Sequence, residues 1–339
     1  MSLSPIYLLL GKFQREYLIT PEKKHFIDIM GGNLLYAAGG SALWLEDKNE
    51  IGLVTRVGED FPRTWITNLQ NNNFNIEGIN ILPEELDLRS FRAYSDIRTS
   101  TTQDPIGHFA KLGITFPKSL LGYKDPNLNL DSSEILINIS LRESDIPKNY
   151  QYANTAHLCA VDFMTHSLMP SVLRQLGITS ITLDPGAGYM NPDFWDRLPS
   201  ILPGLTAFLP SEGDIREFFK GKTEDIWEMI EMIGNWGAEI VVVKRGEKGQ
   251  YIYDTAAKKK YEVPAYPSRM VDLTGAGDVF CGGFLVGYKK TFDPKEAVLH
   301  GNVAASFAVE GSGPFYANDV LPGLPQARLD RLRESIREV

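Results

Sequence analysis

A glycine-rich turn in the last third of the chain combines two kinds of group that could do chemistry. It reads Asp272-Leu273-Thr274-Gly275-Ala276-Gly277-Asp278 and leads into the small and apolar stretch from Val279 to Leu285. This pattern predicts a turn that opens a buried helix. Such a junction aims unpaired backbone N–H groups and a dipole charge of about +0.5 at one point, which favours an anion. Gly275 and Gly277 would allow an approach that a side chain blocks.

Asp278 is expected at the start of that helix, beside the anion site. An acid in this position is often an ordinary helix cap without any chemical role. Phosphoryl transfer, however, needs a base for the attacking hydroxyl and N–H donors for the charge on the transferring group. We therefore predict Asp278 as a catalytic base, with the backbone of Gly275, Ala276 and Gly277 as its anion hole.

Two other phosphate-binding motifs are excluded by their spacing. A Walker loop ending at Gly221-Lys222-Thr223 needs glycine where Arg216 stands. The dinucleotide-binding fingerprint needs glycine where Phe280 stands. The five histidines show no spacing typical of metal ligands, so we interpret them as structural or surface residues.

The elements that position the turn follow a strand–helix alternation from about residue 133 onward. Short apolar runs predict buried strands at 134–139, 157–163, 178–183, 206–209 and 239–243. Amphipathic stretches between them predict helices, among them 167–176 and 224–233. The alternation implies a parallel sheet with helices on both faces, whose ligands gather at the carboxyl ends of the strands.

The first third of the chain has a different pattern. Strands with polar alternation and turn-like connections are predicted at 13–20, 26–30 and 91–97, which indicates a small second sheet. Residues 98–132 hold several prolines and glycines with weak periodicity, so we predict a loop-rich segment there.

The composition excludes several classes of partner. The net charge of −9 opposes nucleic acids and anionic membranes, which attract basic surfaces. Nothing approaches the ~20 apolar residues of a membrane span, and the apolar run near the start is too short for a signal peptide. Cys159 and Cys281 lie far apart in apolar stretches, which indicates reduced core thiols and a cytoplasmic location.

The turn, together with Phe280 and Gly283, resembles the carboxyl-terminal signature of the PfkB (ribokinase-like) carbohydrate kinase family, in which the aspartate is the catalytic base. The resemblance implies an α/β fold, a ribokinase-like three-layer sandwich with a mostly parallel central sheet and a small β-sheet lid. It implies one domain over residues 1–339, with the lid formed by about 12–35 and 88–115. The family's motifs occur in order from Gly11 to Gly313, and residues 98–132 are unmatched.

The resemblance also implies an ATP site. The segment from Lys244 to Gly249 looks like the family's nucleotide loop; Gly246 and Gly249 match it, while Lys244 stands where threonine is usual. Asn302 takes the place of an asparagine that contacts the nucleotide, although a tightly packed helix is an equal alternative. Thr274 is expected to border the same site.

Metal sites are implied more weakly. Pro210-Ser211-Glu212-Gly213-Asp214 stands at the family's Asn-x-x-Glu motif, so Glu212 and Asp214 are expected near Mg²⁺. The alternative is a plain capping box, with Ser211 at the N-cap and Asp214 three residues later. The loop from Gly311 to Pro314, with Asp272 and Thr274, is expected to hold a monovalent cation such as K⁺.

Substrate contacts are implied at the amino end. Gly31 and Gly32 match the first family signature, where a glycine pair lets the sugar approach; Tyr36 belongs to the same signature but departs from it, since asparagine is usual at its position. Tyr36 could instead stack on a substrate ring or fill a gap in the core. Glu16 falls where relatives often bind substrate hydroxyls, with a solvated strand charge as the alternative.

The function implied is ATP-dependent phosphorylation of a hydroxyl on a sugar or sugar-like small molecule. A nucleoside or cyclitol kinase on the same fold is one alternative, because Tyr36 and residues 98–132 allow a flatter or larger acceptor. A small-molecule-binding protein without catalysis is the other, motivated by the departures at Ser211, Tyr36 and Lys244. The small sheet could serve as a lid or as a homodimer interface.

Overall fold

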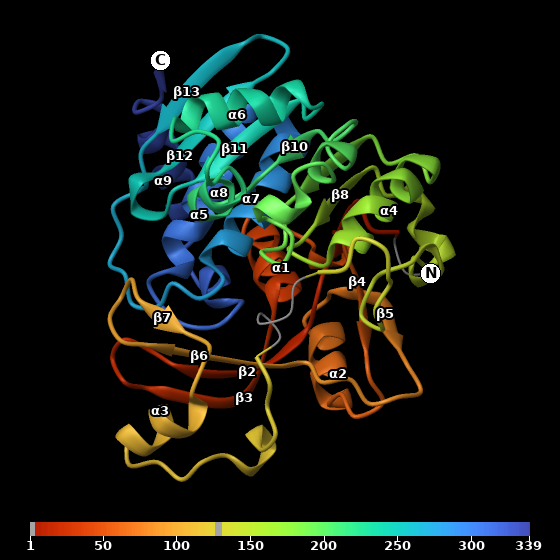
Figure 1. The fold of residues 1–339 in the computed structure, drawn as a ribbon, viewed down its shortest axis with the longest axis vertical. Helices are drawn as coiled ribbons and strands as arrows, with labels where there is room; N and C mark the ends of the chain where they lie inside the picture. Colours follow the sequence, from red (N-terminus) through yellow and green to blue (C-terminus); the bar gives the residue numbers. More distant parts are fainter. Residues whose placement is uncertain (1–3, 126–130) are drawn as a thin grey trace.

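The computed structural model of the chain describes residues 4–125 and 131–339. Within these residues the largest unit is a ten-stranded sheet (Figure 1). From edge to edge it contains β14 (Arg337–Glu338), β13 (Lys259–Val263), β12 (Gln250–Asp254), β11 (Ile240–Lys244), β10 (Ala207–Phe208), β9 (Ser180–Leu183), β8 (Thr155–Leu158), β1 (Tyr7–Leu10), β4 (Ile51–Val57) and β5 (Asn75–Ile81). The strands from β11 to β5 pair parallel, and the last three pairs at the β14 edge are antiparallel.

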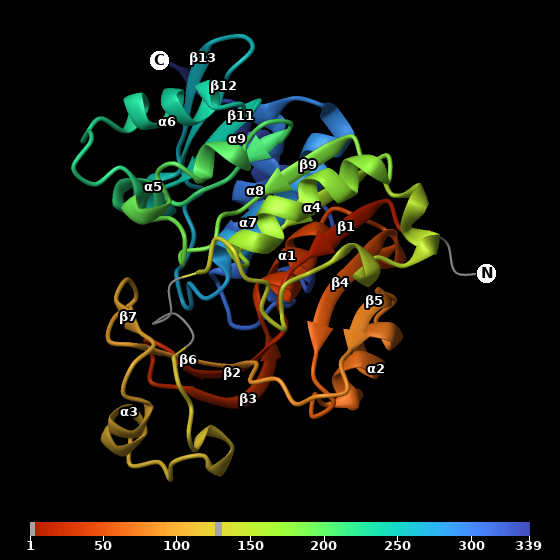
Figure 2. The same ribbon diagram turned by 45° about the vertical axis from the view of Figure 1, so that its right-hand side comes forward.

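Helices cover both faces of this sheet, as the turned view shows (Figure 2). On one face lie α4 (Phe163–Gln175), α5 (Glu212–Phe218) and α6 (Ile226–Asn235); on the other lie α1 (Asn33–Ala42), α2 (Arg63–Asn71), α7 (Ala276–Thr291), α8 (Pro294–Ala308) and α9 (Leu324–Arg333). Side chains alternate between the two layers: Leu8 and Leu10 join the α4 core, and Leu9 joins the α1 core. The predicted three-layer α/β fold with a mostly parallel sheet is confirmed.

Most element predictions in the second part of the chain are confirmed, and one is wrong. The strands expected at 178–183, 206–209 and 239–243 are β9, β10 and β11. The strand expected at 157–163 ends at Leu158, because the Asp162 side chain accepts from the Thr165 N–H and caps α4. The strand expected at 134–139 is absent from the described chain. Ser132 Oγ accepts from the N–H groups of Glu134 and Ile135, a local bond that competes with sheet pairing.

The first third of the chain contributes more to the large sheet than its pattern indicated. β1, β4 and β5 belong to that sheet, and β1 lies near its middle. β4 is buried along its whole length, including Arg56, whose Nε lies 2.7 Å from Asp145 Oδ2. The polar residues inside this strand hid its central position, because the sequence does not show that a distant carboxylate compensates the arginine.

A small four-stranded sheet lies beside the large one. Its order is β3 (His25–Gly31), β2 (Gln14–Ile19), β6 (Arg89–Tyr94) and β7 (Ser100–Thr101). The β2–β6 pair is parallel, and the other two pairs are antiparallel. The segment 98–132, predicted to be loop-rich, contributes β7 and α3 (Pro105–Lys111), whose Phe109 packs on the sheet. Residues 126–130 of that segment lie outside the described part of the chain.

The start of α7 is held in place by close helix packing. A Cβ atom at Gly282 of α7 would lie 1.9 Å from the Ala37 carbonyl oxygen of α1, and one at Gly40 would lie 2.0 Å from that of Val279. Only glycine allows this approach of two backbones. The packing fixes the amino end of α7 at the carboxyl ends of the parallel strands. Among the described helices, none has the length and apolar character needed to cross a membrane.

Candidate active site

The glycine turn opens α7 as predicted. Gly275 is the N-cap residue with φ of 71°, a left-handed conformation that favours glycine. The Ala276 N–H donates to the Leu273 carbonyl over 3.2 Å. In the described chain, no hydrogen bond is found for the N–H groups of Gly277 and Asp278. Of the predicted anion hole, the N–H groups of Gly275 and Gly277 are therefore free among the described residues and that of Ala276 is not, while Asp278 offers a free N–H that was not predicted.

The Asp278 carboxylate is partly buried and has no hydrogen-bond or ion-pair partner among residues 4–125 and 131–339. Burial raises the pKa of Asp278 to about 7, helped by the negative charge of Asp184 and opposed by the positive charge of Lys244. A carboxyl with this pKa is a good general base near neutral pH, because it takes up a proton readily when a substrate hydroxyl offers one.

Lys244 lies in a buried ion pair, and its predicted contact with a nucleotide stays a prediction. Its Nζ lies 2.5 Å from Asp184 Oδ2 and 3.5 Å from Cys281 Sγ. Lys244 ends β11, Asp184 follows β9 and Cys281 faces them from α7, so the cluster forms where the parallel strands meet the helix. Burial alone would lower the pKa of Lys244, but Asp184 outweighs burial and raises it, which keeps the ammonium charged.

Thr274 connects the turn to the small sheet. Its N–H donates to Asp272 Oδ1 over 2.9 Å, and its hydroxyl lies 3.1 Å from the Tyr94 hydroxyl of β6. The other carboxylate oxygen of Asp272 is buried and has no hydrogen-bond partner in the described chain. An unpaired buried carboxylate oxygen is costly, so this atom is a candidate for cation contact.

The predicted substrate residues at the amino end form an internal cluster. Glu16 Oε1 accepts from the Gly32 N–H at 2.8 Å, and Glu16 Oε2 accepts from the Tyr36 hydroxyl at 3.1 Å. Glu16 is only 7% exposed, so the alternative of a solvated strand charge is wrong. Its predicted contact with substrate remains a prediction, since both of its oxygens are already hydrogen-bonded.

The glycine pair has a packing role. A Cβ at Gly31 would lie 2.1 Å from the Glu16 carboxyl carbon, and one at Gly32 would lie 2.4 Å from the Lys12 carbonyl oxygen. Tyr36 is buried and fills core space, and its ring lies where a Cβ at Gly275 would stand. Tyr36 thus joins the glycine pair to the glycine turn that opens α7.

The predicted nucleotide residues fall into two groups. Gly246 and Gly249 both have positive φ, and the space over Gly246 is open. Asn302 is buried: its Oδ1 accepts from the Tyr266 N–H, and its Nδ2 donates to Gln250 Oε1 and the Pro264 carbonyl. Its amide positions the chain after β13, and its predicted contact with a nucleotide stays a prediction.

The predicted magnesium residues are both engaged. The Glu212 carboxylate pairs with Arg216 at 2.8 Å and with Arg245 at 3.3 Å. Asp214 Oδ2 accepts from the Ser211 N–H and hydroxyl, the capping box foreseen as the alternative. The part of the chain that is described contains no group of three or more His, Cys, Asp or Glu side chains that could hold a metal. A cation here would need ligands from phosphates or water.

Two contacts of the site had no local sequence signal. The Arg98 side chain, at the tip of the small sheet, forms a 2.7 Å ion pair with Glu247 of the glycine loop after β11. The Lys244–Asp184 pair joins residues sixty positions apart. The alternation of strands predicts only that Lys244 and Asp184 follow strands of one parallel sheet, and the three-dimensional arrangement shows that they touch.

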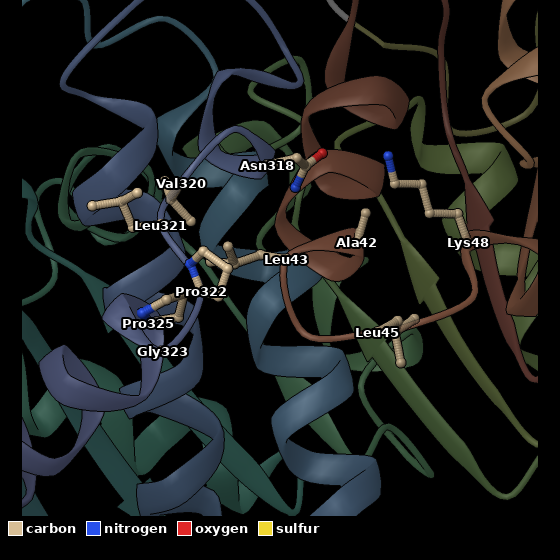
Figure 3. A pocket seen from close by; sticks show the side chains of 10 residues that line it. All are labelled: Ala42, Leu43, Leu45, Lys48, Asn318, Val320, Leu321, Pro322, Gly323 and Pro325. Atoms are coloured by element: carbon tan, nitrogen blue, oxygen red, sulfur yellow. The ribbon is translucent and has the colours of Figure 1, made fainter.

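A surface pocket of about 310 Å³ lies between the end of α1 and the loop before α9 (Figure 3). Leu43, Asn318 and Leu321 are among its lining residues, and Asn318 Nδ2 donates to the Gly39 carbonyl. The pocket contains no residue of the glycine turn or of the lysine cluster. It has no part in the chemistry described above.

Comparison with known proteins adds the following. Residues 167–320 match the pattern described as the pfkB family of carbohydrate kinases. A cytidine kinase of Thermococcus kodakarensis is 26% identical over 296 residues, which are 87% of this chain and 92% of that protein. A sugar kinase of Archaeoglobus fulgidus is 36% identical over 134 residues, which are 40% of this chain and 51% of that protein.

Among solved structures, a candidate ribokinase II from E. coli in complex with ATP and Mg²⁺ has the same fold. Its TM-score is 0.69 at 21% identity, and the match covers 97% of this chain and 100% of that one. At this identity the likeness establishes the arrangement of sheets and helices, and the roles of individual residues rest on the geometry given above.

Proposed function

Because the chain belongs to the pfkB family of carbohydrate kinases and is a phosphotransferase, we propose that it transfers the terminal phosphoryl group of ATP to a hydroxyl of a sugar or sugar-like molecule. One observation carries the proposal more than any other. Asp278, with a pKa raised to about 7, lies without a partner among the described residues beside the unpaired N–H groups that open α7.

The reaction uses these groups in one step. The Asp278 carboxylate accepts the proton of the substrate hydroxyl as its oxygen attacks the terminal phosphorus of ATP. The bond from that phosphorus to the bridging oxygen breaks, and ADP leaves. The N–H groups of Gly277 and Asp278, with the positive end of α7, stabilise the charge on the transferring group.

The residues present fit a nucleotide with its magnesium ion. The open space over Gly246 and the open amino end of α7 leave room for phosphates, and ATP would supply the phosphoryl group. Asp214 uses only Oδ2 in the capping box, so its Oδ1 is suited to receive a water of hydrated Mg²⁺. Glu212 would act through Arg245, which it holds near the glycine loop.

A monovalent cation such as K⁺ fits the unpaired Asp272 oxygen. That oxygen is buried and lacks a partner in the described chain, while Oδ1 receives the Thr274 N–H. A cation there would neutralise Asp272 directly beneath the catalytic turn. Turnover that depends on K⁺, with Na⁺ as the ionic-strength control, would support this site.

The small sheet is proposed as a lid in a single-domain protein. Its Tyr94 reaches Thr274 of the catalytic turn, and its Arg98 reaches Glu247 of the glycine loop. Closure of such a sheet would keep water from the phosphoryl group. We also propose the edge strand β3, which carries the exposed Ile27, as the surface of a homodimer; the molecular mass in solution tests that assembly.

A nucleoside acceptor is the second candidate. It is favoured by the cytidine kinase, whose match to this chain extends over 92% of that protein. The two candidates share Asp278 and differ only in the molecule under the small sheet.

The experiment is ADP formation with Mg-ATP across a panel of sugars, nucleosides and cyclitols. We expect one acceptor class to raise ADP formation well above the rate without acceptor. Thermal shifts with the same panel accompany it. Ligand stabilisation without turnover for any member would contradict the kinase and favour a binding protein.

A further inference from the structure

The space over Gly277 is open, and a single charged group borders it. A Cβ atom built at Gly277 would have one heavy atom within 4 Å, the Nζ of Lys244 at 3.6 Å. The N–H group of Gly277 also has no acceptor in the described chain. The Lys244 ammonium therefore borders the residue whose free N–H would receive an anion.

The ammonium is held there by a built arrangement. The Lys244 side chain is 12% exposed and that of Asp184 is 8% exposed, so the pair is shielded from solvent. Asp184 Oδ2 lies 2.5 Å from Nζ, and Cys281 Sγ lies 3.5 Å from both Nζ and Asp184 Oδ2. These contacts direct a long side chain that would otherwise sample many rotamers, and they leave an ammonium N–H for a further acceptor.

We propose that Lys244 is a catalytic residue that contacts the transferring phosphoryl group, with Asp184 and Cys281 as its positioning residues. This inference rests on the proposed function and adds a donor to it. The ammonium supplies positive charge where negative charge grows during transfer, on the side of the group that faces β11. Asp278 accepts the proton of the attacking hydroxyl. The N–H of Gly277 and the Lys244 ammonium both donate to the phosphoryl oxygens.

A structural role for Lys244 makes a different prediction. If the lysine only neutralises Asp184, its removal harms the protein by leaving a buried carboxylate unpaired, and removal of both charges repairs the damage. If Lys244 contacts the phosphoryl group, removal of both charges repairs the fold but not the chemistry. The double variant therefore separates the two roles.

The test compares Lys244→Met, Asp184→Asn and the double variant Lys244→Met/Asp184→Asn with the unaltered chain. We expect Lys244→Met to lower kcat about 10²- to 10³-fold, the effect of losing one donor to a developing charge. We expect Asp184→Asn to lose far less. The double variant should melt at the temperature of Asp184→Asn yet keep the low kcat of Lys244→Met. Recovery of kcat in the double variant would overturn the proposal.

A binding measurement keeps the test independent of turnover. Titration with pyrophosphate should show at least a tenfold weaker affinity in Lys244→Met and in the double variant than in Asp184→Asn. Equal affinities in all variants would overturn the contact. If the unaltered chain binds pyrophosphate through Lys244 but phosphorylates no acceptor, the proposed function fails while the lysine contact stands.

Discussion

Two carboxylates, the buried Glu16 and the partly buried Asp278, lie on the two sides of the proposed site and differ in their hydrogen bonds. Glu16, from β2 of the small sheet, receives the Gly32 N–H on one oxygen and the Tyr36 hydroxyl on the other. Asp278, from α7, receives no hydrogen bond from any described residue. Burial raises the pKa of both groups, but only Glu16 has donors that oppose the rise.

The difference separates a residue that holds the structure from one that is available to react. A buried carboxylate with both oxygens bonded stabilises the loop and helix that supply its donors. A carboxylate without donors beside an anion site lowers the stability of the folded protein. Such groups are expected at functional sites.

The largest expected effect is on Asp278. Asp278→Asn should lower kcat at least about 10³-fold, because the amide accepts no proton from the substrate hydroxyl. The pKa of Asp278 is raised above its unfolded value, so its ionisation opposes folding and stability falls as pH rises toward 7. The variant should therefore melt no lower than the unaltered chain at pH 8. A near-normal kcat would contradict the assignment of the base.

A smaller effect on turnover, and a larger one on stability, is expected at Glu16. Glu16→Ala leaves the Gly32 N–H and the Tyr36 hydroxyl without their acceptor, at a cost of about 1–3 kcal/mol for each buried group. We expect a lower Tm, a raised KM for the acceptor and a kcat within about tenfold. Tyr36→Phe is the matched control, since it removes one donor and keeps the carboxylate. If Glu16→Ala lost kcat as severely as Asp278→Asn with its Tm unchanged, the contrast between the two acids would be wrong.

The smallest effect is expected at the tip of the small sheet. Arg98 and Glu247 are 66% and 47% exposed, so their ion pair is worth at most about 1 kcal/mol. Arg98→Ala should raise KM for ATP by a few-fold without a change in Tm, and the effect should fade at high salt. Glu247→Ala should do the same, and the double variant should be no worse than either. Additive losses would show that the two residues act separately.

The sequence predicted the architecture and the glycine turn that opens α7, but it did not show the contacts between residues that lie far apart in the chain. Asp278 was recognisable because the glycine turn and the following helix are local patterns. β4 was missed because Arg56 inside it is paired with Asp145, far away in the chain. The ion pair of Lys244 with Asp184 had no local signal, because the two residues are sixty positions apart. Glu16 was expected to contact substrate, and nothing near it in sequence shows the donors from the start of α1.

The pH dependence of kcat/KM tests the assignment of Asp278 most directly, because this quantity reports the ionisation of the free enzyme. The carboxylate must be deprotonated to accept the substrate proton, so kcat/KM should rise with pH and level off above an apparent pKa of about 7. The residual activity of Asp278→Asn should lack this transition. A profile that stays flat from pH 5.5 to 8.5, or a transition that persists in Asp278→Asn, would contradict the role of Asp278 as the base.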